Sequence, residues 1–400
     1  MTIPSDDELL FLALGGAGEI GMNLNLYGHA GKWLMLDLGI AFGDDSMPGV
    51  EVIMPDPSFI EERRKDLVGI VLTHAHEDHL GAVADLWPRL KAPVYATPFA
   101  ASVLRRKLTQ AGLVDAVRIT EIPLRGKFRL GPFDLEMVTM THSILEPNGL
   151  AIRTKFGTVF HTGDWKIDPE PLLGELTDEA LLKRIGDEGV LAMVCDSTNV
   201  FVEGEAGSEA MVRANLRELL KGRTGRVAVT CFASNLARVE SIALAAVAVG
   251  RHPVLSGPAL LRMIEAAQDC GYMLDFPECV SPQDGAYLPK DKVLFICTGS
   301  QGEPRASMAK IANDEHRDLI LEEGDTAIFS SRVIPGNERS VGRLRNALMA
   351  SGVEVITDRD AGIHVSGHPA RDELVRVYQW VRPRIALPVH GEIRHMVEHA

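Results

Sequence analysis

A buried strand that runs directly into a histidine-rich loop restricts the fold of this chain more than any other feature. Val68–Leu72 is a continuous apolar run, typical of a strand covered on both faces of a sheet. The loop Thr73–His79 follows at once and carries three histidines and an aspartate within six residues. Open α/β sheets place their sites at the carboxyl ends of strands. The pattern therefore predicts an α/β fold with a polar site at this edge of a sheet.

The rest of the first half also contains strand-like runs, and its texture changes near residue 200. Before that point we expect strands at Leu9–Leu14, Asn23–Tyr27, Trp33–Leu36, Leu135–Met140 and Thr158–His161. Beyond it, strict alternation predicts a parallel α/β sheet. Its strands are expected at Val227–Cys231, Val293–Cys297, Ala327–Ser330 and Val353–Ile356, and its helices at Ser208–Lys221, Leu236–Val249, Leu260–Cys270 and Val341–Ala350.

The length of 400 residues is too great for one ordinary core. We predict that residues 200–355 form a second domain inserted into a first domain. The first domain comprises residues 1–199 and 356–400, and its last strand is Ile385–Val389.

Bulk composition excludes several classes of protein. The formal net charge of −14 argues against nucleic-acid binding, unless a metal centre or one basic groove supplies local positive charge. The five cysteines are odd in number and lack zinc-knuckle spacing, which indicates a reducing cytosol. We expect no signal peptide, because the first ten residues, MTIPSDDELL, have neither a basic start nor a long apolar run. We expect no membrane span, because no stretch of about 18 uncharged apolar residues is present.

Four further candidate metal ligands each follow a strand-like run. They are Asp37, His142, Asp164 and His390. Imidazole and carboxylate groups bind Zn²⁺ or Mn²⁺ at roughly 2.0–2.2 Å. Taken singly, each has an ordinary explanation as a solvated or capping residue. Their shared placement favours a common metal site.

In order, these segments resemble the ligand motifs of the metallo-β-lactamase superfamily: an Asp, then HxHxDH, then a His, then an Asp. The resemblance implies an αββα sandwich that binds two divalent ions, Zn²⁺ or Mn²⁺. It implies that one ion is held by His74, His76 and His142, the second by Asp78, His79 and His390, with Asp164 bridging both and Asp37 orienting the ligands.

Later motifs resemble the nucleic-acid-processing beta-CASP branch, namely Asp196, His368 and the final His390. The inserted α/β segment also falls where that branch carries its extra domain. Within the branch the chain is similar to the ribonuclease J family over roughly residues 10–395. The segments that carry this likeness are Gly15–Gly21, Thr141–Ile144, Asp196–Asn199, Phe232–Asn235, Thr298–Pro304, Ile334–Glu338, His364–His368 and Pro388–Glu392.

The resemblance implies a cytoplasmic ribonuclease that acts on single-stranded RNA in maturation and decay. It would work as a 5′-to-3′ exonuclease that prefers 5′-monophosphate ends, with endonuclease activity as a second mode. His368 would donate a proton to the leaving oxygen, Asp196 would tune it, and Asp78 would act at the metal centre. The alternative for His368 is a simple phosphate contact.

RNA contacts are implied for two segments, Phe232, Ala233 and Ser234 in the first, and His364, Val365, Ser366, Gly367 and His368 in the second. Backbone N–H groups before a helix suit a phosphate, and Phe232 would stack on a base. The alternatives are an ordinary capped helix start and plain core packing of Phe232.

Several other features of the sequence allow more than one interpretation. The acidic stretch Phe42–Ser46 would bind a structural Ca²⁺ or form an exposed turn, and Gly15–Gly21 is expected to be a tight β-turn. The family extends beyond the position of Ala400 into a C-terminal domain linked to dimerisation, so we expect homo-oligomers of the full-length protein. Competing functions are a small-molecule hydrolase such as a thioesterase, a catalytically silent RNA-binding scaffold, and a DNA-directed nuclease.

Overall fold

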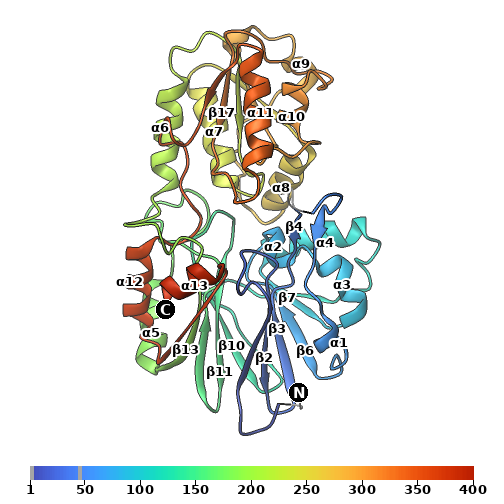
Figure 1. The fold of residues 1–400 in the computed structure, drawn as a ribbon, viewed down its shortest axis with the longest axis vertical. Coiled ribbons are helices and arrows are strands. Elements are labelled where there is room, and N and C mark those ends of the chain that lie inside the picture. Colours follow the sequence, from blue (N-terminus) through green and yellow to red (C-terminus); the bar gives the residue numbers. More distant parts are fainter. Residues whose placement is uncertain (1–3, 44–46) are drawn as a thin grey trace. The chain divides into compact units, whose positions relative to one another are not determined.

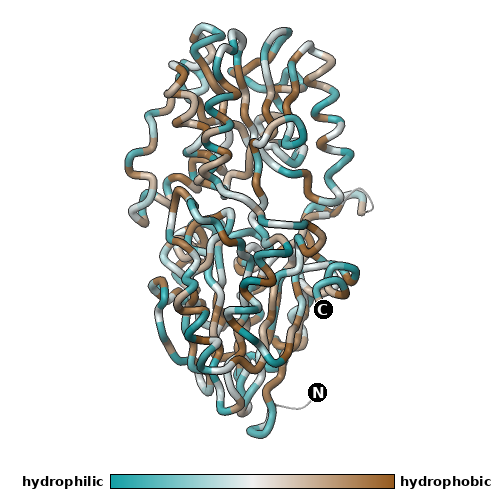
Figure 2. The backbone as a smooth tube through the Cα atoms, turned by 90° about the vertical axis from the view of Figure 1, so that its left-hand side faces the viewer, coloured by the Kyte–Doolittle hydropathy of each residue, from teal (hydrophilic) through white to brown (hydrophobic). Residues whose placement is uncertain are grey.

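The computed structural model describes residues 4–43 and 47–400 (Figure 1). The chain divides into two compact units. Unit 1 contains Met1–Pro169, Gly174–Ala206 and Gly367–Ala400, and unit 2 contains Glu170–Leu173 and Gly207–Ser366. Figure 2 shows hydrophobic and hydrophilic residues alternating along the elements of both units. In the described part of the chain, every helix is too short or too polar to span a bilayer.

Unit 1 contains two six-stranded sheets. The first has the order β1 (Leu10–Gly15), β2 (Leu24–His29), β3 (Lys32–Leu36), β6 (Leu67–Val71), β7 (Val94–Ala96), β8 (Ile119–Glu121). The second has the order β19 (Ile385–Val389), β13 (Val190–Asp196), β12 (Gly157–His161), β11 (Asn148–Thr154), β10 (Phe133–Thr139), β9 (Lys127–Leu130). Neighbours from β3 to β8 and from β12 to β19 are parallel, and the remaining neighbours are antiparallel.

The two sheets pack face to face, and helices cover their outer sides (Figure 1). Strand β11 shows why, because its side chains alternate between two cores. Leu150 and Ile152 join Leu36 and Val71 of the other sheet, whereas Ala151 lies in the cluster that contains the outer helices. The outer helices are α1 (Ser58–Glu61), α3 (Val83–Leu90) and α4 (Pro98–Gln110) beside the first sheet, and α5 (Glu179–Glu188) and α12 (Arg371–Val381) beside the second. Shorter elements are α2 (Glu77–Leu80), α13 (Ile393–His399), β4 (Ala41–Phe42) and β5 (Val52–Ile53).

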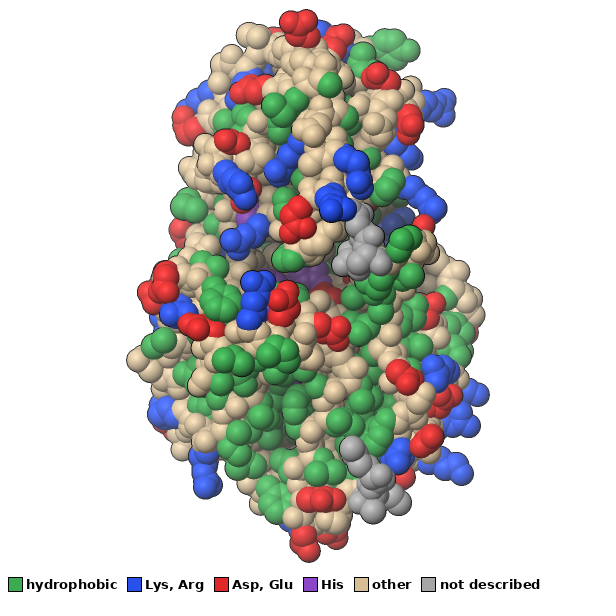
Figure 3. Space-filling view, viewed as in Figure 1, with side chains coloured by type: hydrophobic (Ala, Val, Ile, Leu, Met, Phe, Trp, Pro, Cys, Tyr) green, Lys and Arg blue, Asp and Glu red, His purple; other side chains and the backbone are tan. Residues whose placement is uncertain are grey.

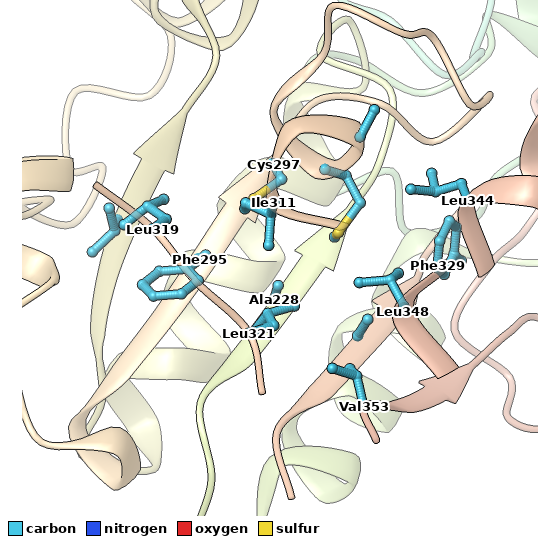
Figure 4. Close-up of a cluster of buried hydrophobic side chains, with 14 of the residues drawn as sticks. Ala228, Phe295, Cys297, Ile311, Leu319, Leu321, Phe329, Leu344, Leu348 and Val353 are labelled. Atoms are coloured by element: carbon cyan, nitrogen blue, oxygen red, sulfur yellow. The ribbon is translucent and has the colours of Figure 1, made fainter. Parts of the chain in front are cut away.

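Unit 2 has one parallel sheet, as its sequence pattern predicts. The strand order is β15 (His252–Ser256), β16 (Val293–Cys297), β14 (Val227–Thr230), β17 (Thr326–Phe329), β18 (Glu354–Ile356). The helices are α6 (Glu209–Leu220), α7 (Leu236–Ala248), α8 (Pro258–Asp269), α9 (Pro282–Gly285), α10 (Ser307–Ala312) and α11 (Glu338–Ala350), with a 3-10 turn at Lys290–Lys292. Phe295, Phe329 and Leu348 form part of the cluster on one face of the sheet (Figure 4). Leu294 and Ile328 are also fully buried, as expected for a sheet covered on both faces.

The unit boundaries lie at residues 206/207 and 366/367, compared with 199/200 and 355/356 proposed from the sequence. Hydrogen bonds explain why the segment 357–366 stays with unit 2. The carbonyl of Ile363 accepts hydrogen bonds from Ser330 Oγ at 2.6 Å and Arg238 Nη1 at 3.2 Å. Eight of the described strands had no counterpart in the sequence prediction, namely β4, β5, β7, β8, β9, β11, β13 and β15.

Candidate metal centre

The polar residues of unit 1 gather where its strands end. Asp37 follows β3, the histidine-rich loop follows β6, and Asp164 comes shortly after β12. Strands β13 and β19 are parallel neighbours, with Asp196 paired to Val389. Because parallel strands end at the same edge, this register places Asp196 beside His390.

Three histidines, His74, His76 and His142, lie close together and form the first cluster. His76 Nδ1 lies 3.1 Å from His74 Nε2 and 3.1 Å from His142 Nε2. Burial is the main cause that lowers the pKa of each imidazole, that of His76 to about 4. These rings are therefore neutral at pH 7, which is the protonation state that binds a metal.

Backbone contacts set the orientation of His142. Its Nδ1 lies 2.5 Å from the carbonyl oxygen of Gly367, so Nδ1 donates and Nε2 faces the other two histidines. A side chain at position 367 would prevent this approach, because a Cβ there would lie 2.7 Å from His142 Cε1 and 2.6 Å from Ser143 Oγ. Glycine is required at position 367 for that steric reason.

Two aspartates and two histidines form a second cluster, Asp78, His79, Asp164 and His390, whose candidate ligand atoms all lie within 4.8 Å of one another. His79 Nε2 lies 3.2 Å from Asp164 Oδ2, and His390 Nε2 lies 3.1 Å from Asp78 Oδ2. Burial opposes the charged form of all four groups, but their mutual attraction is stronger. It raises the pKa of both histidines and holds the pKa of both carboxyl groups below the usual range.

Asp37 is hydrogen-bonded to the histidine-rich loop on the side away from the second cluster. It is fully buried, and its carboxylate lies 2.7 Å from His79 Nδ1. It also accepts hydrogen bonds from the backbone N–H and the hydroxyl of Thr73, at 2.8 and 2.9 Å. The carboxylate therefore presents Nε2 of His79 to the second cluster, in the way outer partners orient metal-binding histidines.

A third grouping contains His368 and Asp196 and shares Asp164 and His390 with the second. His368 Nδ1 lies 2.8 Å from Asp196 Oδ2. Burial, the largest influence, lowers the pKa of His368, but Asp196 and Asp164 together raise it above its ordinary value. The two carboxylates thus favour a protonated imidazole next to the candidate metal-ligand clusters.

Sequence reasoning did not assign a role to Thr198. Its hydroxyl lies 2.7 Å from His390 Nδ1 and donates to the carbonyl oxygen of His390 at 3.1 Å. The threonine therefore orients the last histidine. The available signal was its place in the segment Asp196–Asn199, two residues after a strand-end aspartate.

The remaining predicted contact residues lie in unit 2, apart from Gly367 and His368. Phe232, Ala233 and Ser234 are partly exposed, and the side chain of Asn235 caps α7 by accepting from Arg238 N at 3.0 Å. Phe232 is therefore not a fully buried core residue. His364 and Ser366 are also partly exposed, whereas the Val365 side chain is buried, so Val365 offers only its backbone to a ligand.

Two minor expectations have different outcomes. In the acidic stretch Phe42–Ser46, residues 44–46 lie outside the described residues, so the calcium prediction stays untested. The run Gly15–Gly21 ends β1 and continues as bends and isolated bridges, in which Gly16, Gly18 and Gly21 have positive φ. Its Gly16 carbonyl accepts from His390 N at 2.6 Å, which places the segment beside the candidate metal-ligand clusters.

Three family descriptions match parts of the chain. Residues 45–194 match "Beta-lactamase superfamily domain", residues 224–348 match "Ribonuclease J, beta-CASP domain", and residues 336–400 match "Zn-dependent metallo-hydrolase RNA specificity domain". Together with the two sheets and the inserted parallel sheet, these matches confirm the predicted sandwich with an inserted α/β domain.

Curated relatives span nearly the whole chain. The chain is 49% identical to a protein named Ribonuclease J from Sinorhizobium meliloti, over 99% of this chain and 71% of that protein. It is 40% identical to Ribonuclease J from Mycolicibacterium smegmatis, over 97% of this chain and 70% of that protein. A crystal structure of a protein of unknown function from Enterococcus faecalis V583 has the same fold, with a TM-score of 0.67, 14% identity, and coverage of 96% and 94% of the two chains.

Proposed function

This chain belongs to the ribonuclease J family and is a metal-dependent ribonuclease, and we propose that it degrades single-stranded RNA from the 5′ end. The proposed preference is for 5′-monophosphate ends, with internal cleavage as a second mode. The observation that carries the proposal is the position of His368, which shares Asp164 and His390 with the metal-ligand cluster and is paired with Asp196.

The residues suit a pair of divalent ions. The donors are imidazole nitrogens and carboxylate oxygens in tight buried groups, a mixed set that accepts Zn²⁺ and Mn²⁺. We propose that His74, His76 and His142 would hold the first ion, that Asp78, His79 and His390 would hold the second, and that Asp164 would contribute to both. When bound, the ions supply an activated water and stabilise negative charge on the phosphate.

The chain's own residues supply the proton. Asp196 holds Nδ1 of His368, so Nε2 carries the proton that would pass to the leaving 3′ oxygen. Asp78 is the most exposed of the acidic ligands, with 30% of its side chain accessible, whereas His79 and Asp164 are almost fully buried. We therefore place Asp78 on the side of the centre that faces the substrate.

We propose that unit 2 binds RNA through the segments Phe232–Ser234 and His364–Ser366. Phe232 would stack on a base, and the serine hydroxyls with nearby backbone N–H groups would contact phosphates. Figure 3 shows Lys and Arg side chains interspersed with Asp and Glu on the visible face of the protein. With a net charge of −14, binding would depend on local contacts more than on the overall field.

The test is digestion of one single-stranded RNA prepared with a 5′-monophosphate, a 5′-triphosphate or a 5′-hydroxyl, in Mn²⁺ and in Zn²⁺. Stepwise release of mononucleotides, fastest from the monophosphate, is expected. His76→Ala is the control for contaminating nuclease, and a DNA strand of equal sequence tests selectivity for RNA. Thioester hydrolysis with intact RNA would support a small-molecule hydrolase, and RNA binding without cleavage would support a silent scaffold.

We also propose that the protein works in the cytoplasm. All five cysteines lie in the described part of the chain and are free, which is consistent with a reducing cytoplasm. We propose that the protein forms homo-oligomers, which light scattering after size-exclusion chromatography would measure.

A further inference from the structure

The carboxylate of Glu373 is fully buried and accepts three backbone hydrogen bonds. One oxygen accepts from Ile167 N at 2.6 Å. The other accepts from Ala206 N and from Ala370 N, each at 2.8 Å. Burying a carboxylate costs folding free energy unless hydrogen-bond donors satisfy its oxygens. These three bonds therefore fix the position of the Glu373 side chain.

These donors belong to three separate segments of unit 1. Ile167 follows Asp164 by three residues, and Ala370 follows His368 by two. Ala206 is the last residue of unit 1 before the chain enters unit 2. One side chain therefore joins the loop of a proposed metal ligand, the loop of the proposed proton donor and the end of a connection between the units.

Helix capping explains only one of the three bonds. Glu373 is the third residue of α12, where a glutamate commonly accepts from the residue before the helix, here Ala370. The bonds to Ile167 and Ala206 reach segments 206 and 167 residues away in sequence, respectively. Neither of these two bonds is part of the helix cap.

Neighbouring contacts fasten the same connection to the start of α12. Arg371 N donates to the Val202 carbonyl at 2.9 Å, and Asp372 N donates to the Gly204 carbonyl at 3.0 Å. Arg376 also forms an ion pair with Glu205. The chain leaving unit 1 is thus held along one helical turn, with Glu373 as its buried member.

We infer that Glu373 is a positioning residue that holds the loops of Asp164 and His368 in register with each other and with the chain entering unit 2. The catalytic consequence rests on the proposed function. Release of the carboxylate would let the proton donor and the metal ligand move independently, and small misplacements of catalytic groups are costly in rate.

The test compares the full 400-residue wild-type chain with Glu373→Gln and with the control Asp372→Asn. Both substitutions remove one negative charge from the first turn of α12, but Asp372 is exposed. The amide nitrogen of glutamine cannot accept a hydrogen bond, so at least one of the three N–H groups loses its partner. Hydrogen–deuterium exchange of Ile167, Ala206 and Ala370 reports this loss without any RNA or metal.

In Glu373→Gln we expect exchange at one or more of these amides to be at least about tenfold faster. We expect kcat on RNA to fall about tenfold or more with KM nearly unchanged. Asp372→Asn should match wild type in both measurements. Unchanged exchange would overturn the inference. Faster exchange with wild-type kcat would also overturn it, because Glu373 would then have only a structural role.

Two further controls keep the outcomes distinct. If Glu373→Gln does not fold, Glu373→Asp keeps the charge on a shorter side chain and should show the same changes in exchange and kcat; wild-type values for it would overturn the inference. If wild-type protein leaves RNA intact, the proposed function fails, whereas the exchange data still test the contacts of Glu373.

Discussion

The imidazole of His368 and the carboxylate of Asp196 form a hydrogen-bonded pair 2.8 Å apart, across 172 residues of sequence. Asp196 ends strand β13, and His368 lies in the segment that returns from unit 2. The aspartate is completely buried, so its charge acts on the imidazole with little screening. This pair is the basis for the first two predictions.

We predict that Asp196→Asn shifts the pH dependence of cleavage. Burial lowers the pKa of His368, and the charge of Asp196 is the main influence that raises it. An acid catalyst loses activity as the pH rises through its pKa. Without the aspartate charge that loss should begin about one pH unit lower or more. The measurement is kcat against pH at saturating metal, and an unmoved basic limb would contradict the role of the pair.

His368→Ala should abolish most cleavage while leaving metal binding intact. General acid catalysis contributes about 10²- to 10⁴-fold, so kcat should fall within that range. His368 belongs to neither of the two clusters that we assign to the ions, so metal content measured by mass spectrometry should stay near wild type. His76→Ala is the comparison that should lose metal. Equal metal loss in both variants would make His368 a structural residue.

Removing the metal should destabilise unit 1. A ligand that binds only the folded state stabilises it by about 2.7 kcal/mol when its free concentration is about 100 times Kd. Chelation should therefore lower the thermal unfolding temperature, and added Zn²⁺ or Mn²⁺ should restore it. Asp164→Asn should reduce this change in unfolding temperature, because Asp164 belongs to the second cluster and its Oδ2 lies 3.9 Å from His142 Nε2 of the first. An identical response in Asp164→Asn and wild type would argue against its place between the ions.

Arg238→Met should destabilise unit 2 strongly. Arg238 is 1% exposed and donates to both carboxylate oxygens of Glu209, at 2.8 and 2.9 Å. Its removal leaves Glu209 buried without its cationic partner, which typically costs about 3–5 kcal/mol. Chemical denaturation measures the change. The double variant with Glu209→Met should recover part of the loss, and a double variant no better than the single would contradict this explanation.

Much of the framework could be predicted from local patterns. The bounds predicted for Val293–Cys297 and Ile385–Val389 are those of β16 and β19, because continuous apolar runs bounded by polar residues identify strands. Strand β11, Asn148–Thr154, gave a weaker signal. It begins with Asn and Gly, which disfavour strands, and its conformation depends on pairing with β10 and β12 on either side.

The sequence by itself determined which residue types follow the strands, and hence that His74, His76, Asp37 and Asp164 would stand at strand ends. It carried no information on lateral strand order. Only the tertiary structure decided that β13 lies between β12 and β19, which brings Asp164, Asp196 and His390 to one edge. The contacts of Thr198 and Glu373 were likewise decided only by the tertiary structure. Spacing along a chain reports local conformation, whereas hydrogen bonds between distant segments depend on how whole sheets and helices pack.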